Sequence, residues 1–319
     1  MWVRFPLPAP KMSPRLDSFA SLGPHGFHRV AYVEWGPRDA RHIVVCVHGL
    51  TRNSRDFDEL ARYLAVRGCR VVCMDVVGRG DSDWLENKTD YGFAQYVSDA
   101  AGLLARITSA GPSLLGRLQG AGGAHVIDWV GTSMGGLIGM MVAAKPNSPI
   151  RGLVLNDVGP LIPWPALARL KLASGVDGAR FASLREVEAY LREACSSFGP
   201  LSDAQWRRLA LHGSRRGKDG YALAYDPAIV STMRAGGGAG VAFGADFFFG
   251  IDLWPVWDAV RCPTLVLRGA ESDLLLDSTV KRMQERGPRM KAVEFRGIGH
   301  APWLMSEDQI RPIADFLLP

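Results

Sequence analysis

The sequence predicts an α/β fold in which a mostly parallel, twisted sheet is flanked by helices. Short apolar runs rich in Val, Ile and Leu alternate with longer segments of helical spacing, which is typical of βαβ architectures. The alternation stops once, at about residue 158, and resumes at about residue 255. Hydrophobic residues make up 47% and charged residues 22% of the 319 positions, so the chain can bury a sizeable core.

Individual elements follow from local patterns. The run at 43–47 is apolar throughout, as expected of a strand buried on both faces. The segment 54–67 has apolar residues at helical spacing and is followed by Gly68, which favours a helix end. Strands are predicted at 29–34, 43–47, 70–74, 124–130, 151–155, 264–268 and 291–295. Helices that alternate with these strands are predicted at 54–67, 93–110, after Gly135, and at 278–286 and 309–317.

The interrupted stretch predicts an insertion. Residues 158–255 contain helical patterns at 164–173, 184–196 and 203–212 and a Gly-rich hinge at 236–240, but no clear buried strand. We therefore expect a core formed by 17–157 and 256–319 and an all-helical insertion at 158–255. Residues 1–16 carry four prolines and are expected to be poorly ordered.

Several classes of function are disfavoured. The net charge of +5 comes from basic residues scattered among 32 acidic ones, so we expect no nucleic-acid partner. No apolar stretch approaches the length of a membrane span, and the five cysteines are odd in number and widely spaced; we expect a cytoplasmic protein without a membrane partner. No metal or nucleotide motif is present, so no cofactor and no metal site are expected. A homodimer is left open.

The sequence Gly131-Thr132-Ser133-Met134-Gly135 stands between a predicted strand and a predicted helix. Glycines two residues before and two residues after the serine allow a turn so tight that the hydroxyl is exposed at its apex. A Cβ at either glycine would clash with the crossing strand and helix. Ser133 is therefore the candidate nucleophile.

A serine hydroxyl needs a base and an acid that orients the base. His300 follows the strand predicted at 291–295, and Asp273 follows the strand predicted at 264–268. Both stand past the carboxyl end of a strand, where ligands bind in open α/β sheets. We expect His300 as the base and Asp273 as the acid. Asp157, which follows the strand predicted at 151–155, is the alternative acid or a residue of the pocket.

A developing oxyanion needs two hydrogen-bond donors. The N–H of Met134 lies at the start of the helix after the nucleophile, where backbone donors have no partner within the helix. The loop after the strand 43–47 reads Val47-His48-Gly49-Leu50, and the N–H of Leu50 is the second candidate. Gly49 permits this loop to turn inward, and His48 is expected to support it rather than to act as a base.

Together, His48-Gly49, the loop Asp75…Gly78…Gly80…Ser82, the elbow at Ser133, Asp273 and Gly299-His300 resemble the α/β-hydrolase fold family over about residues 27–319. The resemblance implies a sheet with this insertion as a cap domain. Serine at the elbow resembles esterases, lactonases and carbon–carbon hydrolases, whereas epoxide hydrolases and haloalkane dehalogenases carry aspartate there. Carbon–carbon hydrolases of ring-cleavage products usually have Asn before the serine, and Thr132 departs from that.

We therefore expect a cofactor-independent serine hydrolase that cleaves carboxylic esters or related acyl compounds through an acyl-enzyme. The aromatic residues and the Gly-rich hinge of the insertion favour a small-molecule substrate whose acyl group is moderately sized and largely apolar. The alternatives are an enol-lactonase, a carbon–carbon hydrolase, and a non-catalytic protein that binds a ligand with the same fold.

Overall fold

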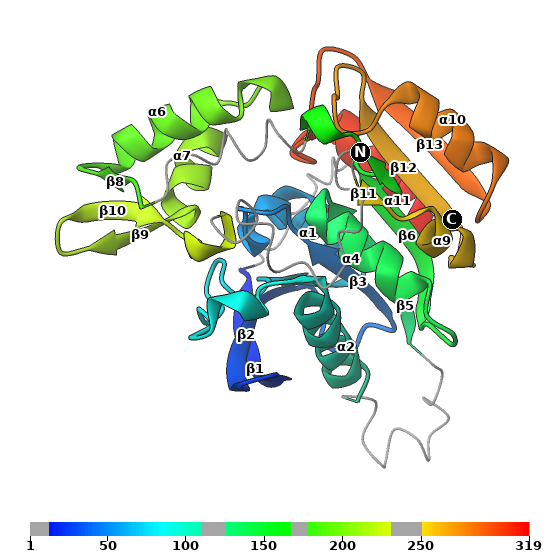
Figure 1. The fold of residues 1–319 in the computed structure, drawn as a ribbon, viewed down its shortest axis with the longest axis horizontal. Coiled ribbons are helices and arrows are strands. Elements are labelled where there is room, and N and C mark those ends of the chain that lie inside the picture. The colour runs from blue at the N-terminus through cyan, green and yellow to red at the C-terminus, as the bar shows by residue number, and fades with distance from the viewer. Residues whose placement is uncertain (1–12, 110–124, 167–177, 231–250, 319) are drawn as a thin grey trace, which may run out of the picture.

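A computed structural model describes residues 13–109, 125–166, 178–230 and 251–318 (Figure 1). These residues form an eight-stranded sheet in the order β1-β2-β4-β3-β5-β6-β12-β13. Strands β1 and β2 are antiparallel to their neighbours, and the pairs from β4 to β13 are parallel. The strands are β1 (Arg15–Gly23), β2 (Gly26–Trp35), β3 (His42–Val47), β4 (Arg70–Met74), β5 (Val126–Thr132), β6 (Ile150–Asn156), β12 (Thr264–Gly269) and β13 (Met290–Phe295). The predicted α/β class and mostly parallel sheet are confirmed.

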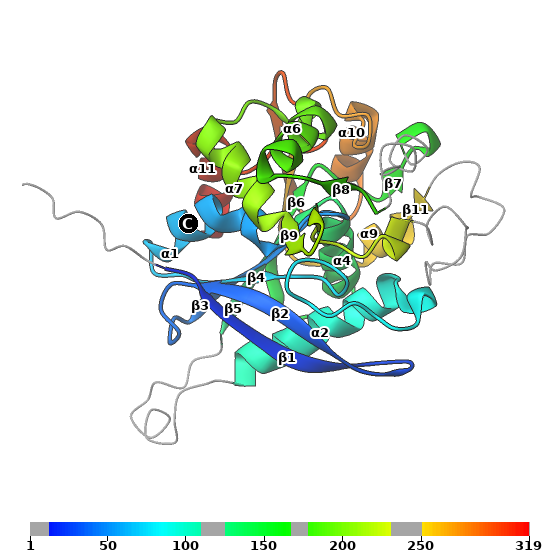
Figure 2. The same cartoon turned by 90° about the vertical axis from the view of Figure 1, so that its left-hand side faces the viewer.

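Two layers of helices cover this sheet (Figure 2). On one face, α2 (Phe93–Ser109), α4 (Met134–Ala143), α9 (Trp254–Ala259) and α10 (Asp277–Glu285) contribute to the larger hydrophobic cluster. On the other face, α1 (Asp58–Ala65) and α11 (Glu307–Leu317) contribute to the second cluster. The segment predicted as one helix from residue 54 begins as a 3-10 turn, η1 (Ser54–Phe57), whose cap is Asn53. None of the helices in the described ranges is long and apolar enough to cross a bilayer.

Strand β1 was missed by the sequence analysis. It pairs with β2 along its whole length, from Arg15 opposite Glu34 to Gly23 opposite Gly26. Arg15 and Leu16 therefore belong to the sheet, although we expected residues 1–16 to be poorly ordered; residues 1–12 lie outside the described ranges. Strand β1 lies at the edge of the sheet and is mostly part-exposed, so its sequence lacks the continuous apolar run that identified the inner strands.

The insertion is not all-helical. It contains α6 (Leu184–Ala194), η3 (Ser196–Phe198) and α7 (Asp203–His212), but also a small antiparallel sheet of β8 (Arg180–Phe181), β10 (Gly220–Leu223) and β9 (Ser214–Gly217). A further strand pair joins β7 (Leu161–Ile162) to β11 (Ile251–Asp252). These strands have two to four residues and are mostly part-buried or exposed, so they leave no long apolar run in the sequence. The predicted hinge at 236–240 lies outside the described ranges.

An ion pair on the sheet predicts how stability depends on pH. His42 Nε2 lies 2.5 Å from Oδ2 of the buried Asp128, and this hydrogen bond raises the pKa of His42 to about 9. Because the folded protein binds this proton more tightly than the unfolded chain does, protonated His42 stabilises the fold fully below about pH 6.5. The stabilisation disappears as the pH rises through about 9. It amounts to at most about 3 kcal/mol.

We expect the free energy of unfolding to fall between pH 6.5 and 9 in the wild type, and to fall much less in His42→Gln. Urea unfolding at intervals of half a pH unit measures both slopes. Parallel slopes for the two proteins would show that another group causes the pH dependence.

Candidate active site

Ser133 stands at the apex of a tight turn between β5 and α4. Its φ of 52° and ψ of −116° are strained for a residue with a side chain. A Cβ on Gly131 would lie 2.3 Å from the carbonyl carbon of Gly135, and a Cβ on Gly135 would lie 2.0 Å from the carbonyl oxygen of Val47. Neither position can hold a side chain, so the glycines of the elbow have the steric role that the sequence indicates.

The structure brings Ser133 and His300 together. His300 lies in the loop after β13, and its Nε2 is 2.9 Å from Ser133 Oγ. On the other side of the ring, Nδ1 is 2.7 Å from Oδ2 of Asp157, which directly follows β6. Asp157 is fully buried and His300 is 6% exposed. The three side chains form a continuous hydrogen-bonded chain from carboxylate to hydroxyl.

The expected partner of His300 therefore has to be corrected from Asp273 to Asp157. Asp273 is exposed, and it is the preceding residue of the same loop, Ser272, that is buried and turned inward. Ser272 Oγ donates to Oδ2 of Asp157 at 2.5 Å, and Gly269 N donates to Oδ1 at 2.8 Å. Gly269, the last residue of β12, and Ser272 in the loop after it thus donate hydrogen bonds to the Asp157 carboxylate.

The position of Asp157 follows from its strand. Strand β6 lies between β5 and β12, so Asp157 emerges from the strand that is paired with β5, which leads to Ser133. A φ of 55° at Asp157 turns the chain sharply at that point. The adjacent Asn156 donates from Nδ2 to Thr132 Oγ1 and to the carbonyl of Pro302, at 3.0 and 2.8 Å. Asn156 thereby connects the elbow with the loop that carries His300, a link that the sequence analysis missed.

His48 supports the loop that leads to Gly49 and Leu50. Its Nε2 accepts a hydrogen bond from the N–H of Val76 at 3.0 Å, so the ring proton is on Nδ1, which donates to the Gly49 carbonyl at 2.7 Å. Burial lowers the pKa of His48 to about 3 and keeps the ring neutral. The neutral imidazole thus connects the backbone of Gly49 to that of Val76.

Arg79 is a further supporting residue, and the sequence analysis did not single it out. Its side chain is fully buried. Nε donates to the carbonyl of Leu50 at 2.8 Å, Nη1 donates to the carbonyl of Val77 at 2.8 Å, and Nη2 lies 3.6 Å from Sδ of Met134. Arg79 thus contacts both residues whose amides are candidate oxyanion donors.

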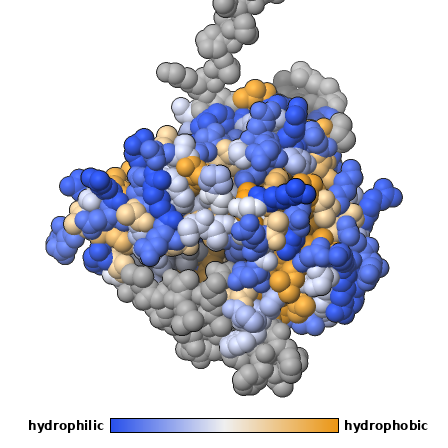
Figure 3. Space-filling model, turned by 90° about the horizontal axis from the view of Figure 1, so that it is seen from above, coloured by the Kyte–Doolittle hydropathy of each residue, from blue (hydrophilic) through white to orange (hydrophobic). Residues whose placement is uncertain are grey.

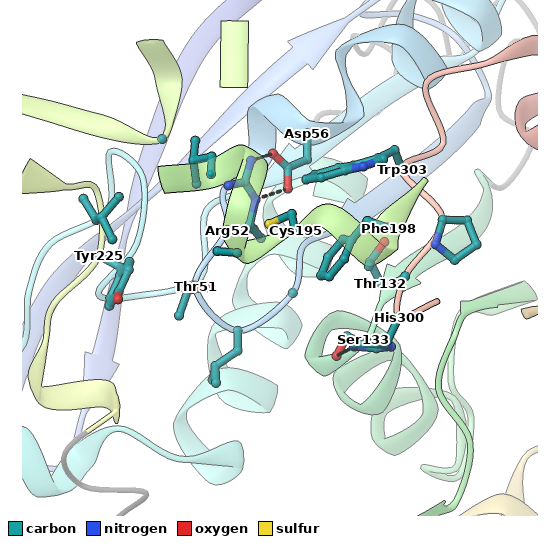
Figure 4. A pocket seen from close by; sticks show the side chains of 18 of the residues that line it. Thr51, Arg52, Asp56, Thr132, Ser133, Cys195, Phe198, Tyr225, His300 and Trp303 are labelled. Atoms are coloured by element: carbon teal, nitrogen blue, oxygen red, sulfur yellow. Dashed lines mark hydrogen bonds and ion pairs between the residues drawn. The ribbon is translucent and has the colours of Figure 1, made fainter. Parts of the chain in front are cut away.

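A pocket opens beside Ser133 and His300 (Figure 4). It encloses about 160 Å³ between the sheet edge and the insertion. Phe198 of the insertion packs edge-on against the His300 ring, with centroids 6.1 Å apart, and Ser197 O accepts from Gly299 N at 2.6 Å. The described residues that line the pocket are Gly49, Leu50, Thr51, Arg52, Asp56, Phe57, Thr132, Ser133, Tyr190, Leu191, Ala194, Cys195, Phe198, Gly213, Leu223, Tyr225, His300, Ala301, Pro302 and Trp303.

The surface of this pocket is mostly apolar, although several of its lining residues have polar side chains. Arg52 and Asp56 form an ion pair in the wall. Cys195 is buried, and burial raises the pKa of its thiol to about 11, so it remains protonated. Within the described ranges, no three His, Cys, Asp or Glu side chains are grouped to hold a metal ion. On the face shown in Figure 3, hydrophilic residues predominate among the coloured ones and hydrophobic residues lie between them.

Comparisons with known proteins agree with this architecture. The family model described as the alpha/beta hydrolase family matches residues 44–316. The 3-hydroxybutyrate-oligomer hydrolase of Cupriavidus necator is 41% identical over 302 residues, which cover 93% of this chain and 96% of that protein. The 2-(acetamidomethylene)succinate hydrolase of Mesorhizobium japonicum is 26% identical over 81% of each chain. The crystal structure of an alpha/beta hydrolase from Novosphingobium aromaticivorans superposes with a TM-score of 0.77, at 32% identity, and covers 95% of this chain and 98% of that one.

The family match spans most of the chain, and the Cupriavidus relative is similar over nearly its whole length. The chain therefore belongs to the alpha/beta hydrolase family, and it is a hydrolase.

Proposed function

We propose that the chain is a serine hydrolase that cleaves the ester bonds of short 3-hydroxybutyrate oligomers through an acyl-enzyme. The observation that carries the proposal is the hydrogen-bonded chain Asp157–His300–Ser133 in a protein so similar to a 3-hydroxybutyrate-oligomer hydrolase. This substrate class is narrower than the carboxylic esters expected from the sequence, and it lies within them.

The proposed reaction has two steps. Ser133 Oγ attacks the ester carbonyl while His300 Nε2 takes its proton, and the same proton then passes to the oxygen of the departing hydroxy acid. A water molecule, deprotonated by His300, releases the acyl group from Ser133. Asp157 holds the proton of His300 on Nδ1, so that Nε2 is free to accept. The amides of Leu50 and Met134 are the proposed donors to the oxyanion.

The pocket supports a short substrate. Its volume of about 160 Å³ is below the roughly 300–1,000 Å³ of pockets that hold drug-sized ligands. Its walls include Leu50, Leu191, Phe198 and Leu223, which fit the methyl-bearing backbone of a 3-hydroxybutyrate ester. Residues 158–255, which supply Phe198, Leu191 and Leu223, are interpreted here as the cap, and 17–157 with 256–319 as the core, extended by the first residues of β1.

The test is a substrate panel. Linear dimer, trimer and tetramer of 3-hydroxybutyrate, in both enantiomers, are compared with p-nitrophenyl butyrate, an enol-lactone and a vinylogous diketone. We expect kcat/KM to be highest for the oligoesters, with monomer release followed by chromatography. Turnover of simple esters without turnover of any oligoester would overturn the substrate class and leave the hydrolase class intact. A preference for the lactone or the diketone would favour the alternatives from the sequence.

A further inference from the structure

Arg52 stands in the wall of the active-site pocket, two residues after Leu50. Its side chain is only 12% exposed and that of its partner Asp56 only 15%. Burial acts to lower the pKa of Arg52, but the Asp56 carboxylate outweighs this and raises the pKa above the ordinary value. The guanidinium is therefore a permanent positive charge beside a pocket that is otherwise mostly apolar.

The contacts of Arg52 leave one nitrogen available. Nε and Nη2 bind the two oxygens of Asp56 at 2.8 and 2.7 Å, and the Trp303 ring lies 5.4 Å from the guanidinium carbon. Nη1 has no hydrogen-bond partner in the part of the chain that the structure describes. This atom is not fully enclosed by the protein. It lies 3.8 Å from the site of a Cβ on Gly213, which also lines the pocket.

The stem of Arg52 starts beside the nucleophile. A Cβ on Gly49 would lie 3.7 Å from Ser133 Cβ and 3.9 Å from Arg52 Cγ. Because Gly49 has no side chain, it places no group between these two atoms. Figure 4 shows the Arg52–Asp56 pair beside Cys195 and Trp303 in the same pocket as Ser133 and His300. An ester held at Ser133 is therefore within the same enclosure as a partly unpaired cation.

A linear oligomer of hydroxy acids has one feature that fits this cation. Its last unit ends in a carboxylate, whose carbon is three bonds from the oxygen of the last ester. When Ser133 attacks the carbonyl of that ester, the Oγ–carbon bond forms, the ester carbon–oxygen bond breaks, and the leaving hydroxy acid receives the proton from His300. The leaving group then carries the free carboxylate, and guanidinium groups bind carboxylates through charge-assisted hydrogen bonds.

We propose that Arg52 binds the terminal carboxylate of the oligoester on the leaving-group side, so that the enzyme releases single hydroxy-acid units from the carboxyl end. This inference rests on the proposed function. Asp56 shares the guanidinium, which weakens its hold on any other anion and lets the hydroxy-acid product dissociate. Arg52 is thus a specificity-determining residue for a singly charged substrate that is otherwise apolar.

The experiment compares the dimer of 3-hydroxybutyrate as the free acid with its methyl ester, which has the same internal ester and no charge. In the wild type we expect a lower KM for the acid. In Arg52→Gln we expect KM for the acid to rise roughly tenfold or more, with KM for the methyl ester changed less than about twofold. Arg52→Lys should restore part of the loss, since it keeps the charge but not the planar fork. Asp56→Asn should lower KM for the acid and strengthen inhibition by 3-hydroxybutyrate.

Arg55→Gln is the matched control. Arg55 pairs with Asp58 through the same kind of two-nitrogen contact, at 2.9 and 2.7 Å, but it does not line the pocket. We expect it to leave the acid-to-ester ratio of KM unchanged. Equal changes for acid and ester in Arg52→Gln, or no preference for the acid in the wild type, would overturn the inference.

Two further outcomes are distinguishable. If Arg52→Gln does not fold, as judged by circular dichroism, the response of Asp56→Asn and the wild-type ratio decide the question. If the wild type hydrolyses neither dimer but does hydrolyse p-nitrophenyl butyrate, the proposed substrate has failed rather than the role of Arg52. Release of internal fragments instead of monomers from a labelled tetramer would also contradict the proposal that single units are released from the carboxyl end.

Discussion

Ser133→Ala is expected to lower kcat for ester hydrolysis by roughly 10⁴–10⁶-fold, because the proposed mechanism needs the Ser133 hydroxyl to form the acyl-enzyme. Alanine tolerates the φ of 52° no worse than serine does, so the thermal unfolding midpoint should stay within a few degrees of the wild-type value. Initial rates with a 3-hydroxybutyrate dimer and with p-nitrophenyl butyrate measure the loss. Labelling by a fluorophosphonate should disappear in parallel.

Ser148→Ala is the control for this change, because Ser148 lies in the turn before β6 and outside the pocket. It should keep both turnover and labelling. Retained turnover in Ser133→Ala would mean that the hydrogen-bonded chain ending at this serine is not the catalytic one.

Asp157→Asn should lower kcat by about 10³–10⁴-fold near neutral pH, whereas Asp273→Asn should change it less than about threefold. The asparagine oxygen can keep the hydrogen bond from Gly269 N, which leaves the amide NH₂ facing Nδ1 of His300. Nδ1 must then accept, the ring proton moves to Nε2, and Nε2 can no longer take the proton of Ser133.

Each of these two substitutions is the control for the other, because each removes one carboxylate from one of two neighbouring loops. A larger loss in Asp273→Asn than in Asp157→Asn would restore the original assignment from the sequence. KM should change little in either variant, because neither carboxylate lines the pocket.

The sequence predicted those parts of the site that depend on local signals. The elbow around Ser133 is encoded within five residues, and His300 follows a strand in a Gly-rich loop, so both could be located without the fold. The acid could not be chosen in this way. Asp157 and Asp273 both follow a strand, and both strands, β6 and β12, lie between β5 and β13 in the sheet. Only the conformation of the two loops in the folded chain shows that Asp157 contacts His300.

The remaining omissions have similar causes. The hairpin Ser214–Leu223 and strand β1 are exposed or only part-buried at nearly every position, so burial imposes little pattern on them. Arg79 and Arg52 are charged residues in loops, and a sequence gives no sign that one is fully buried and the other partly enclosed. Their partners, the Leu50 carbonyl and Asp56, become apparent only with the fold.

The contact of Phe198 with the imidazole of His300, together with the backbone hydrogen bond from Gly299 to Ser197, has a consequence for the evolution and engineering of this enzyme. The surroundings of His300, the proposed general base, are built partly from the core and partly from the insertion, which is the proposed cap. A cap grafted from another hydrolase would have to rebuild these contacts as well as a new substrate cavity. Exchange of caps is therefore expected to alter the rate of proton transfer along with the choice of substrate, so that the two properties evolve together.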